Sequence, residues 1–480
     1  MNFKTITHLI GRILLTEAGL LLIPLIVSVL YGESTIIFIV PIVLLGIFGG
    51  VGIKFVPIHP KLFAKDGLVV VALAWILMSG FGAIPFVLSG HSISFVDAFF
   101  ETVSGFTTTG ASILSDIEAL PNGLLFWRSF THWIGGMGVL VLVMAIIPSN
   151  HEHGMHLLRA EVPGPIVGKL VSRIKDTAKI LYCIYFAITV IEIILLLLGG
   201  MSLFDSCIHA FGTAGTGGFS NKGLSVGAYD NVYFDVVISI FMLLFGINFN
   251  LYYFLLIRKA KEVFTSQELW CYLGIVFVSV IIIAINISHL YENFAQSLRY
   301  SLFQVSSIIT TTGFATADFN LWPGLSKIIL VSLMFIGACA GSTGGGIKVS
   351  RVLILAKAAI ADMKQIIHPK SISIVRLDGK IISSKTVRSV HLFLSVYIFI
   401  LVISTMILAL DAKDIVSTFT AVVACFNNIG PGLEVVGPMG NFSSFSNFSK
   451  LILSFDMLAG RLEIFPILLM FSPSLWRKKK

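Results

Sequence analysis

Long apolar runs alternate with short polar segments along most of this 480-residue chain. Seven of the runs approach the roughly 20 residues that an α-helix needs to cross about 30 Å of hydrocarbon. They are Ile13 to Tyr31, Ile36 to Phe55, Leu68 to Leu88, Ile180 to Gly199, Phe234 to Ile257, Leu269 to Ile287 and Leu392 to Leu410. The pattern predicts an all-α membrane protein that crosses the bilayer many times.

A second pattern occurs four times along the chain. A full span is followed by a shorter amphipathic stretch, then by a cluster rich in Gly, Thr or Asn, and then by another full span. The short stretches are SFVDAFFETVSGF, SLFDSCIHAFGTA, NFAQSLRYSLFQVSSII and DIVSTFTAVVACF, and the clusters are TTTGAS, GTGGFS, TTTGFA and NNIGPG. The clusters align on Gly110, Gly218, Gly313 and Gly430, which are 108, 95 and 117 residues apart. Such near-constant spacing indicates an internal repeat.

The repeat divides the chain into five expected parts. They are two N-terminal transmembrane helices in residues 1–66, repeat 1 in 67–150, repeat 2 in 170–262, repeat 3 in 266–365 and repeat 4 in 385–480.

The short stretches do not have the length to cross a membrane. A helix of about 11 residues is only about 16 Å long. We therefore expect each of them to enter halfway and the cluster after it to return as extended backbone. Unpaired amides that face lipid cost several kcal/mol each, so such loops must be buried in protein or line water. Four loops satisfy this requirement together if they converge on a shared axis.

A cation is the simplest occupant of such an axis. Inward carbonyl oxygens replace the ion's hydration shell, and each short helix directs the negative end of its dipole toward the axis. Glycine permits the dihedral angles that this requires, while threonine stiffens the strand. The expected ion-binding residues are Thr108, Thr109, Gly110, Thr216, Gly217, Gly218, Thr311, Thr312, Gly313, Asn428, Ile429 and Gly430. The alternative is that the clusters only pack helices together, and their fourfold occurrence favours the pore.

Composition and charge agree with a membrane protein. The chain is 56% hydrophobic and 12% charged, with a mean hydropathy of +0.94, which excludes an ordinary soluble core. The net charge is +8, and the basic residues cluster in five segments, which the positive-inside rule places in the cytoplasm together with the C-terminus. They are Lys54 to Lys65, Arg159 to Lys179, Arg258 to Lys261, Lys348 to Arg388 and Arg477 to Lys480. This distribution indicates membrane lipids, with their acidic headgroups, as partners and no nucleic acid.

Catalytic, metal and redox chemistry have little support. The five cysteines lie in apolar surroundings without metal-like spacing. His132 and His209 are expected to be structural, because no zinc-binding pattern accompanies them. The first apolar run is longer than a signal-peptide core and lacks its cleavage site, so we expect it to be retained.

Several stretches resemble the TrkH-type subunits of the Trk/Ktr/HKT superfamily of potassium transporters. They are GACAGSTGGGIKVSRVLIL (Gly337 to Leu355), NNIGPGLEVVGPMGNF (Asn427 to Phe442) and LSFDMLAGRLEIFPILLMFSPSLWR (Leu453 to Arg477). Two extra spans before the first repeat also fit this type. The resemblance implies a potassium uptake subunit of the bacterial inner membrane with four membrane, pore-loop, membrane units around a pseudo-fourfold axis. It further implies a homodimer, gating by a cytosolic nucleotide-binding ring of TrkA type, K⁺ as the transported ion, and no catalytic cofactor.

The clusters depart from chemical fourfold symmetry. The second reads Gly215-Thr216-Gly217-Gly218 and the fourth Asn427-Asn428-Ile429-Gly430, and each contains a single aligned glycine. We hypothesise fewer ordered ion sites than in tetrameric potassium channels, and looser discrimination between potassium and sodium.

The third repeat contains an expected gate. Four glycines among the six residues 341–346 interrupt its second span, at a cost of about 1 kcal/mol each relative to alanine. The break falls on the cytoplasmic half, so its loop lies across the expected ion path. The resemblance agrees, because TrkH-type relatives carry a gating loop here, and it marks Gly344, Gly345, Gly346 and Lys348. A phosphate-binding loop is disfavoured, since Lys348 is one residue too far along for that motif.

Arg461 is a charged residue in the last span, where a cation costs at least about 2.5 kcal/mol. The resemblance places it below the filter, where it impedes ions. Alternatively it pairs with Glu463, Asp456 or a carbonyl, and both roles are compatible. The partner of Asp456 stays open.

Four other acidic residues and one linker complete the expectations. Asp97 and Asp205 are expected to cap the first two short helices, and Glu17 and Glu192 to have interhelical or interfacial partners. The charged linker from Lys357 to Arg388 is expected to form a cytoplasmic helical hairpin.

Three other functions remain as alternatives. A sodium-permeable or ion-coupled transporter of the same family is nearest. A broken-helix carrier for an organic solute would show two inverted repeats instead of four. A membrane enzyme would need convergent nucleophiles, bases or metal ligands, which the sequence does not offer.

Overall fold

The computed structural model describes residues 1–55, 64–91, 93–138, 174–370 and 374–473. The α-helices are α1 (Phe3–Leu20), α2 (Leu22–Leu30), α3 (Ile36–Lys54), α4 (Ala64–Gly82), α5 (Ile84–Leu88), α6 (Phe95–Phe106), α7 (Asn122–Gly136), α10 (Ile174–Leu198), α11 (Leu203–Gly215), α12 (Val232–Phe245), α13 (Phe249–Leu256), α14 (Ala260–Phe264), α15 (Gln267–Asn286), α16 (Phe294–Ile309), α17 (Gly324–Phe335), α18 (Val349–Ile367), α19 (Ser384–Leu408), α20 (Ile415–Phe426), α21 (Asn447–Arg461) and α22 (Phe465–Met470). Short 3₁₀ helices are η1 (Ser225–Tyr229), η2 (Ser288–Leu290), η3 (Phe319–Leu321), η4 (Ala409–Asp411) and η5 (Glu434–Val436), and the strands are β1 (Arg376–Leu377) and β2 (Lys380–Ile381).

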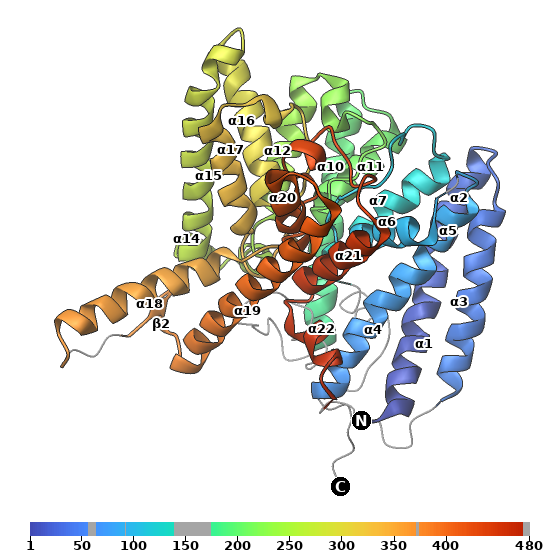
Figure 1. Cartoon of the computed structure of the whole chain (residues 1–480), viewed down its shortest axis with the longest axis horizontal. Coiled ribbons are helices and arrows are strands. Elements are labelled where there is room, and N and C mark those ends of the chain that lie inside the picture. Colours follow the sequence, from blue (N-terminus) through green and yellow to red (C-terminus); the bar gives the residue numbers. More distant parts are fainter. Residues whose placement is uncertain (56–63, 92, 139–173, 371–373, 474–480) are drawn as a thin grey trace.

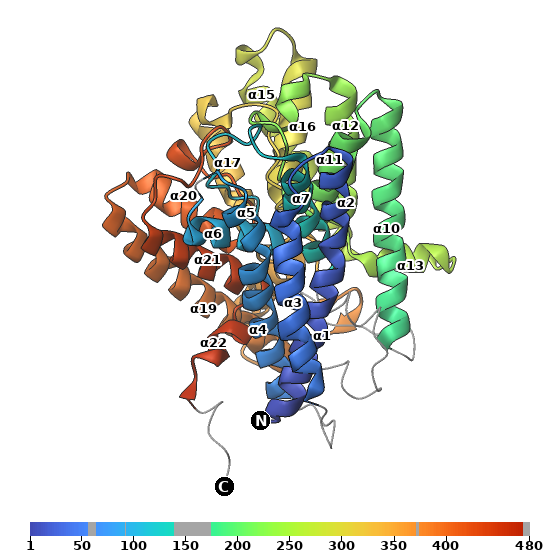
Figure 2. The ribbon, with the colours of Figure 1, turned by 90° about the vertical axis from the view of Figure 1, so that its right-hand side faces the viewer.

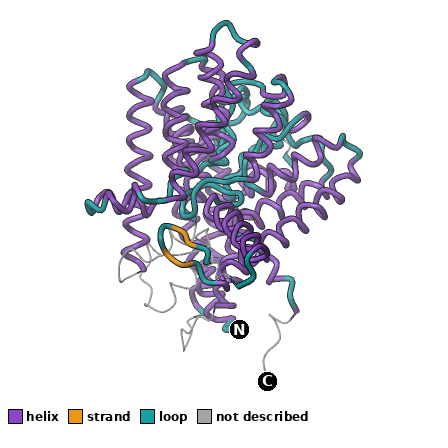
Figure 3. The backbone as a smooth tube through the Cα atoms, turned by 90° about the vertical axis from the view of Figure 1, so that its left-hand side faces the viewer, coloured by secondary structure: helices purple, strands orange, loops and turns teal. Residues whose placement is uncertain are grey.

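The helices form one bundle (Figure 1). Helices α1 to α5 lie on one flank and α15 to α17 on the other, with α6, α7, α11, α20 and α21 between them. Helix α10 runs along the bundle edge while α13 extends sideways (Figure 2). The two strands lie toward the end of the bundle where the N-terminus lies (Figure 3).

Six of the seven predicted apolar runs are confirmed as helices long enough to cross a membrane. The six spans found among the described residues are Phe3–Leu30, Ile36–Lys54, Lys65–Leu88, Asp176–Leu198, Gln267–Asn286 and Ser384–Asp411. The all-helical membrane class is therefore confirmed. Some predicted parts lie outside the described residues. They are residues 139–150 of repeat 1, and residues 159–173 and 477–480 of two basic segments.

The seventh predicted run, Phe234 to Ile257, forms a bent pair of helices instead of one straight helix. Helices α12 and α13 meet there at an angle of 89°. The break follows from a tertiary contact, because the N–H of Phe249 donates to the carbonyl of Gly341 at 3.0 Å and the N–H of Cys339 to that of Gly246 at 3.0 Å. The side chain of Asn248 caps α13. An apolar run by itself carries no trace of these long-range bonds.

Helices α1 and α3 approach each other through glycines. A Cβ atom added to Gly11 would come within 2.9 Å of the Gly52 backbone, and one added to Gly52 within 2.8 Å of Gly11 Cα. Small residues at a transmembrane contact allow such backbone packing, which replaces the hydrophobic drive that lipid removes.

The four short helices are α6, α11, α16 and α20. They contain 12, 13, 16 and 12 residues, so at 1.5 Å per residue none exceeds about 24 Å. Their N-caps are Ser94, Ser202, Asn293 and Asp414. The expected caps Asp97 and Asp205 are therefore wrong, because both lie in the first turn and their N–H groups donate to the capping serines.

The linker from Lys357 to Arg388 is not a helical hairpin. Helix α18 ends at Ile367, and strands β1 and β2 pair before α19 begins at Ser384. Asp378 and Gly379 connect the strands with φ angles of 49° and 74°. Two consecutive residues with positive φ, of the type Asp-Gly, are a strong hairpin signal that explains the turn.

Candidate ion pathway

The four clusters follow the same backbone path. We call residues 107–110, 215–218, 310–313 and 427–430 the ring loops, and Gly110, Gly218, Gly313 and Gly430 the aligned glycines. Two residues before each aligned glycine, the chain adopts a left-handed conformation. The φ angles are 56° at Thr108, 55° at Thr216, 59° at Thr311 and 56° at Asn428. This conformation costs a residue with a Cβ roughly 1 to 2 kcal/mol, so its occurrence at four matching positions points to a shared requirement.

One hydrogen bond repeats in all four ring loops. The N–H before each aligned glycine donates to the carbonyl five residues earlier, in the last turn of the short helix. The bonds are Thr109 to Ser104 at 2.8 Å, Gly217 to Gly212 at 2.8 Å, Thr312 to Ser307 at 2.8 Å and Ile429 to Ala424 at 2.9 Å. This C-cap arrangement uses orphan carbonyls of the helix end and fixes where the extended strand begins.

The aligned glycines bring the ring loops into mutual contact. Their φ angles of 78°, 75°, 85° and 97° belong to the left-handed region that favours glycine. A Cβ added to any of them would collide with a carbonyl oxygen of the neighbouring loop. The colliding pairs are Gly110 with Gly217, Gly218 with Thr312, Gly313 with Ile429, and Gly430 with Thr109. These pairs run from the first loop to the second, third and fourth and back to the first, so the loops close a ring.

All twelve residues predicted to bind the ion lie in this ring. The seven that carry side chains are fully buried: Thr108, Thr109, Thr216, Thr311, Thr312, Asn428 and Ile429. Asn428 also ties the fourth loop to the first, because its Nδ2 donates to Thr109 Oγ1 at 3.0 Å. Gly217 lies between Thr216 and the aligned Gly218.

A cavity of about 130 Å³ lies on one side of the ring. All four aligned glycines line it, together with segments that follow the ring loops. Arg128 and Lys222 are the charged side chains in its lining. Lys222 forms an ion pair with Glu118 at 3.4 Å, and Glu118 Oε1 accepts the N–H of Gly223 at 3.3 Å.

The predicted helix break in the third repeat is confirmed. Helix α17 ends at Phe335, and α18 begins only at Val349. Within this connection, residues 341–346 form what we call the glycine-rich segment. The N–H of Gly345 donates to Thr311 Oγ1 at 2.7 Å, and a Cβ added to Gly344 would lie 2.9 Å from the Thr310 carbonyl oxygen. The segment therefore contacts the start of the ring loops, opposite the side that faces the cavity.

Lys348 closes the glycine-rich segment on itself. Its Nζ donates to the carbonyl oxygens of Gly344 and Gly345, the latter at 3.1 Å, and the side chain is buried. Gly346, which lies between Gly345 and Lys348 in the sequence, has a φ angle of 66°. A buried ammonium held by carbonyls is a satisfied cation.

Arg461 connects the glycine-rich segment to the first repeat. Its Nη1 donates to the Thr343 carbonyl at 2.7 Å, and its Nη2 to the carbonyls of Gly135 and Gly136 at 2.5 and 2.7 Å. Of the alternatives named for this arginine, pairing with a carbonyl is thus confirmed.

The acidic residues near Arg461 have partners on other helices. Glu463 forms an ion pair with Arg351 at 2.5 Å. Asp456, whose partner the sequence left open, accepts from Ser404 Oγ at 2.8 Å. Both contacts join α21 or its C-terminal extension to a neighbouring helix.

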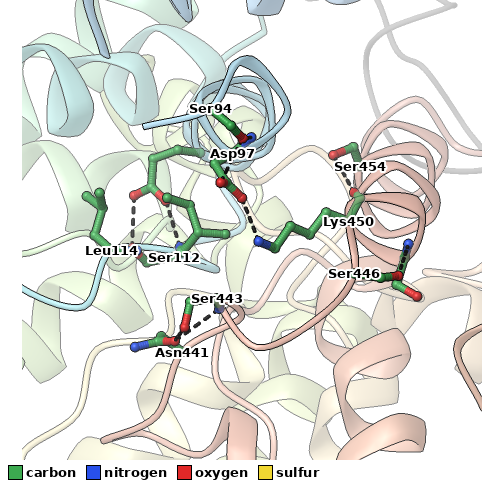
Figure 4. Close-up of polar contacts among 12 residues, drawn as sticks. Ser94, Asp97, Ser112, Leu114, Asn441, Ser443, Ser446, Lys450 and Ser454 are labelled. Carbon is green, nitrogen blue, oxygen red and sulfur yellow. Dashed lines mark hydrogen bonds and ion pairs between the residues drawn. The ribbon is translucent and has the colours of Figure 1, made fainter. Parts of the chain in front are cut away.

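Two ion pairs were not predicted from the sequence. Arg128 Nε lies 2.6 Å from Glu101 Oε1, with both side chains buried. Lys450 Nζ lies 2.6 Å from Asp97 Oδ1 and joins α21 to α6 (Figure 4). The criterion that singled out Arg461, a cation within an apolar stretch, also applies to Arg128 in LLFWRSF and was a usable signal.

Both histidines are structural, as expected. His132 Nδ1 lies 2.7 Å from the Gly105 carbonyl oxygen, and its Nε2 accepts the N–H of Phe219 at 3.2 Å. His209 bridges the Asp205 carbonyl and Ser220 Oγ. The described residues contain no group of three or more histidine, cysteine or acidic side chains that could hold a metal.

The two buried glutamates, Glu17 of α1 and Glu192 of α10, make no hydrogen bond through their carboxylates among the described residues. Their expected interhelical or interfacial partners therefore stay predictions.

The family model for TrkH, described as a cation transport protein, matches residues 47–478. The chain belongs to the TrkH family of cation transport proteins. It is 36% identical to the Trk system potassium uptake protein TrkH of Escherichia coli over 488 residues, which cover 100% of both chains. The TrkG protein of the same species is 33% identical, with 99% of each chain covered.

A solved structure supports the same family at the level of the fold. The crystal structure of the potassium transporter TrkH from Vibrio parahaemolyticus matches with a TM-score of 0.89 and 32% identity, covering 99% of this chain and 100% of that one. TrkH-family membership makes the chain a multi-pass transport protein and not an enzyme.

Proposed function

We propose that this chain is a potassium uptake transporter whose ion path runs through the ring of loops. The observation that carries the proposal is the closed cycle of four loops with one backbone conformation. K⁺ is the transported ion, and Rb⁺ passes as its close analogue. The TrkH and TrkG relatives named as potassium uptake proteins support this choice of ion.

The ring loops act as a selectivity filter in this proposal. Ions enter from the cavity, pass the aligned glycines, and are coordinated by carbonyl oxygens of the ring loops in place of water. The short helices α6, α11, α16 and α20 end at these loops, so the negative ends of their dipoles favour a cation there. The binding residues are the twelve predicted ones, from Thr108 to Gly110, Thr216 to Gly218, Thr311 to Gly313 and Asn428 to Gly430.

The glycine-rich segment acts as the gate. The backbone of the segment lies below the ring at Gly344, Gly345 and Gly346. Because these residues have no side chains, a modest movement of the backbone is enough to open or close the ion path. Lys348 and Arg461 hold the closed position through the carbonyls of Gly344, Gly345 and Thr343. The positive charge of Arg461 also repels a cation that has passed the ring.

The chain is organised as two N-terminal helices, residues 1–66, and four repeats, residues 67–150, 170–262, 266–365 and 385–480. It resides in the bacterial inner membrane with its C-terminus in the cytoplasm and anionic lipid headgroups beside its basic segments. The repeat boundaries are supported by the short helices, each of which precedes one ring loop.

The transporter works as a homodimer that a cytosolic nucleotide-binding ring of TrkA type regulates. Helix α18 offers a surface for such partners, because it extends away from the bundle (Figure 1). Its exposed apolar side chains recur at helical spacing: Ile360, Met363, Ile366 and Ile367. The same helix continues directly from the glycine-rich segment, so a partner that moves α18 acts on the gate.

Two alternative functions are considered beside potassium uptake. A sodium-permeable or ion-coupled member of the family has the same architecture, and the unequal ring loops, with Asn428 and Ile429 in the fourth, favour loose selectivity. A carrier for an organic solute is disfavoured, because four ring loops are difficult to reconcile with a two-repeat substrate pocket.

Ion flux into proteoliposomes tests the proposal. Purified protein is reconstituted, and uptake of Rb⁺, Na⁺ and Li⁺ is measured with and without competing K⁺. We expect Rb⁺ uptake that K⁺ inhibits, with slower Na⁺ and Li⁺ uptake. Equal uptake of the three ions would favour the sodium-permeable alternative, and absence of any cation uptake would overturn the proposal.

A further inference from the structure

In three of the four repeats, the residue nine positions before the aligned glycine contacts the strand that follows that glycine. These residues are Glu101, His209, Gln304 and Ala421. Ser112 Oγ donates to Glu101 Oε1 at 3.0 Å, and His209 Nε2 lies 3.0 Å from Ser220 Oγ, in each case two residues after the aligned glycine. Gln304 Nε2 reaches the carbonyl of Ala317 at 3.4 Å. The side chain at this position therefore changes around the ring, from a carboxylate to an imidazole, an amide and a methyl group.

The support is strongest in the first repeat. Glu101 Oε2 accepts the N–H of Ile113 at 2.9 Å, and Oε1 accepts from Ser112 Oγ and from Arg128 Nε, the latter at 2.6 Å. One buried carboxylate thus holds two consecutive residues just beyond Gly110. Hydrogen bonds to an ionised acceptor are shorter and roughly twice as strong as neutral ones, so an ionised Glu101 holds the strand after Gly110 firmly.

Arg128 extends the same network to the second repeat. Its Nη1 donates to the Ser220 carbonyl at 2.9 Å, and its guanidinium lies 3.5 Å from the centroid of the Phe219 ring. Ser220 follows the aligned Gly218 by two residues. A continuous path of contacts therefore runs from Ser112 and Ile113 through Glu101 and Arg128 to Ser220, joining the segments that follow two neighbouring ring loops.

We infer that Glu101 and Arg128 are positioning residues that fix the spacing of the first two ring loops and thereby set the discrimination between large and small cations. This inference rests on the proposed function. Discrimination between K⁺ and Na⁺ depends on the number and placement of carbonyl oxygens around the ion. Among the supports described above for the four repeats, only the network of Glu101 and Arg128 combines two buried opposite charges with contacts to the segments that follow two ring loops.

The test compares Glu101→Gln with wild type in proteoliposomes. Glutamine keeps the size of the side chain and one carbonyl acceptor, but it removes the negative charge and one acceptor oxygen. We expect Rb⁺ uptake to persist while the ratio of Rb⁺ to Na⁺ uptake falls about tenfold, which corresponds to about 1.4 kcal/mol. The melting temperature in detergent is measured in parallel.

Asp235→Asn is the matched control. The buried Asp235 also forms an ion pair at 2.6 Å, with the half-buried Arg299, but that pair joins α12 to α16 and not the segments that follow two ring loops. We expect Asp235→Asn to lower the melting temperature without changing the uptake ratio. An equal loss of ratio in both variants would overturn the inference, because a general loss of stability would then explain it.

Ser112→Ala serves if Glu101→Gln does not fold, since it removes a single hydrogen bond from the network. We expect the uptake ratio to fall about twofold, in the lower range expected for loss of one hydrogen bond. An unchanged ratio in whichever of the two variants folds would overturn the inference alone. Absence of Rb⁺ uptake by the wild type would instead overturn the proposed function, and the inference with it.

Discussion

Replacing Arg461 by alanine tests the proposed gate. The guanidinium makes three hydrogen bonds of 2.5 to 2.7 Å, one to Thr343 in the glycine-rich segment and two to Gly135 and Gly136 of the first repeat. Bonds to charged groups contribute about 1.5 to 3 kcal/mol each. The bond to Thr343 connects the segment directly to Arg461. Its loss therefore shifts the balance between closed and open segment by about 1.5 kcal/mol, which is roughly tenfold in the equilibrium.

The assay is initial Rb⁺ uptake into proteoliposomes without any regulatory partner. We expect uptake by Arg461→Ala to exceed that of wild type about tenfold, provided that the segment is closed most of the time. Arg461→Lys keeps the charge but not the forked geometry that reaches two repeats, so we expect an intermediate value.

Arg299→Gln is the control for loss of a half-buried, ion-paired arginine, because Arg299 pairs with Asp235 and Asp230 away from the glycine-rich segment. We expect its uptake to match the wild type. The reasoning would be refuted if Arg461→Ala folded normally and conducted no faster than wild type, or if Arg299→Gln conducted equally fast.

Three further changes test other parts of the path by the same uptake assay. Gly218→Ala places a Cβ against the Thr312 carbonyl oxygen, so we expect Rb⁺ uptake to fall at least tenfold. Near-normal uptake would show that the ring does not carry the ion. The control is Gly223→Ala, where a Cβ meets nothing within 4 Å. Lys348→Met removes the bonds to Gly344 and Gly345, so we expect faster uptake without a partner, and slower uptake would contradict a closing role. Lys222→Gln removes a positive charge from the cavity lining, so we expect uptake to rise about twofold at low ionic strength and to approach the wild-type value at high salt; an effect independent of salt would contradict the electrostatic cause.

Local features of the sequence predicted most of the helices and all four ring loops. Apolar run length determines which segments cross lipid, and six spans followed it. The ring loops could be predicted because clusters of glycine and threonine indicate a non-helical backbone. The positive φ angles at Thr108 and Gly110 are an example. The helix break before Val349 followed in the same way from four glycines among six residues.

Features set by distant contacts were not predicted. The 89° bend between α12 and α13 lies in a continuous apolar run, and it depends on bonds to Cys339 and Gly341 almost a hundred residues away. The partner of Arg128 is Glu101, 27 residues earlier, in a helix whose depth and orientation had to be known first. The caps Ser94 and Ser202 were missed because a serine and an aspartate near a helix start are both plausible caps, and only the geometry distinguishes them.

The central claim is that four ring loops coordinate a potassium-like ion on one axis. The most direct measurement is the anomalous diffraction signal of Rb⁺ in crystals of the protein grown with rubidium salt. We predict a peak encircled by the carbonyl oxygens of Thr109, Gly217, Thr312 and Ile429. A protein that transports Rb⁺ in liposomes but shows its rubidium peak away from these four residues would contradict the account.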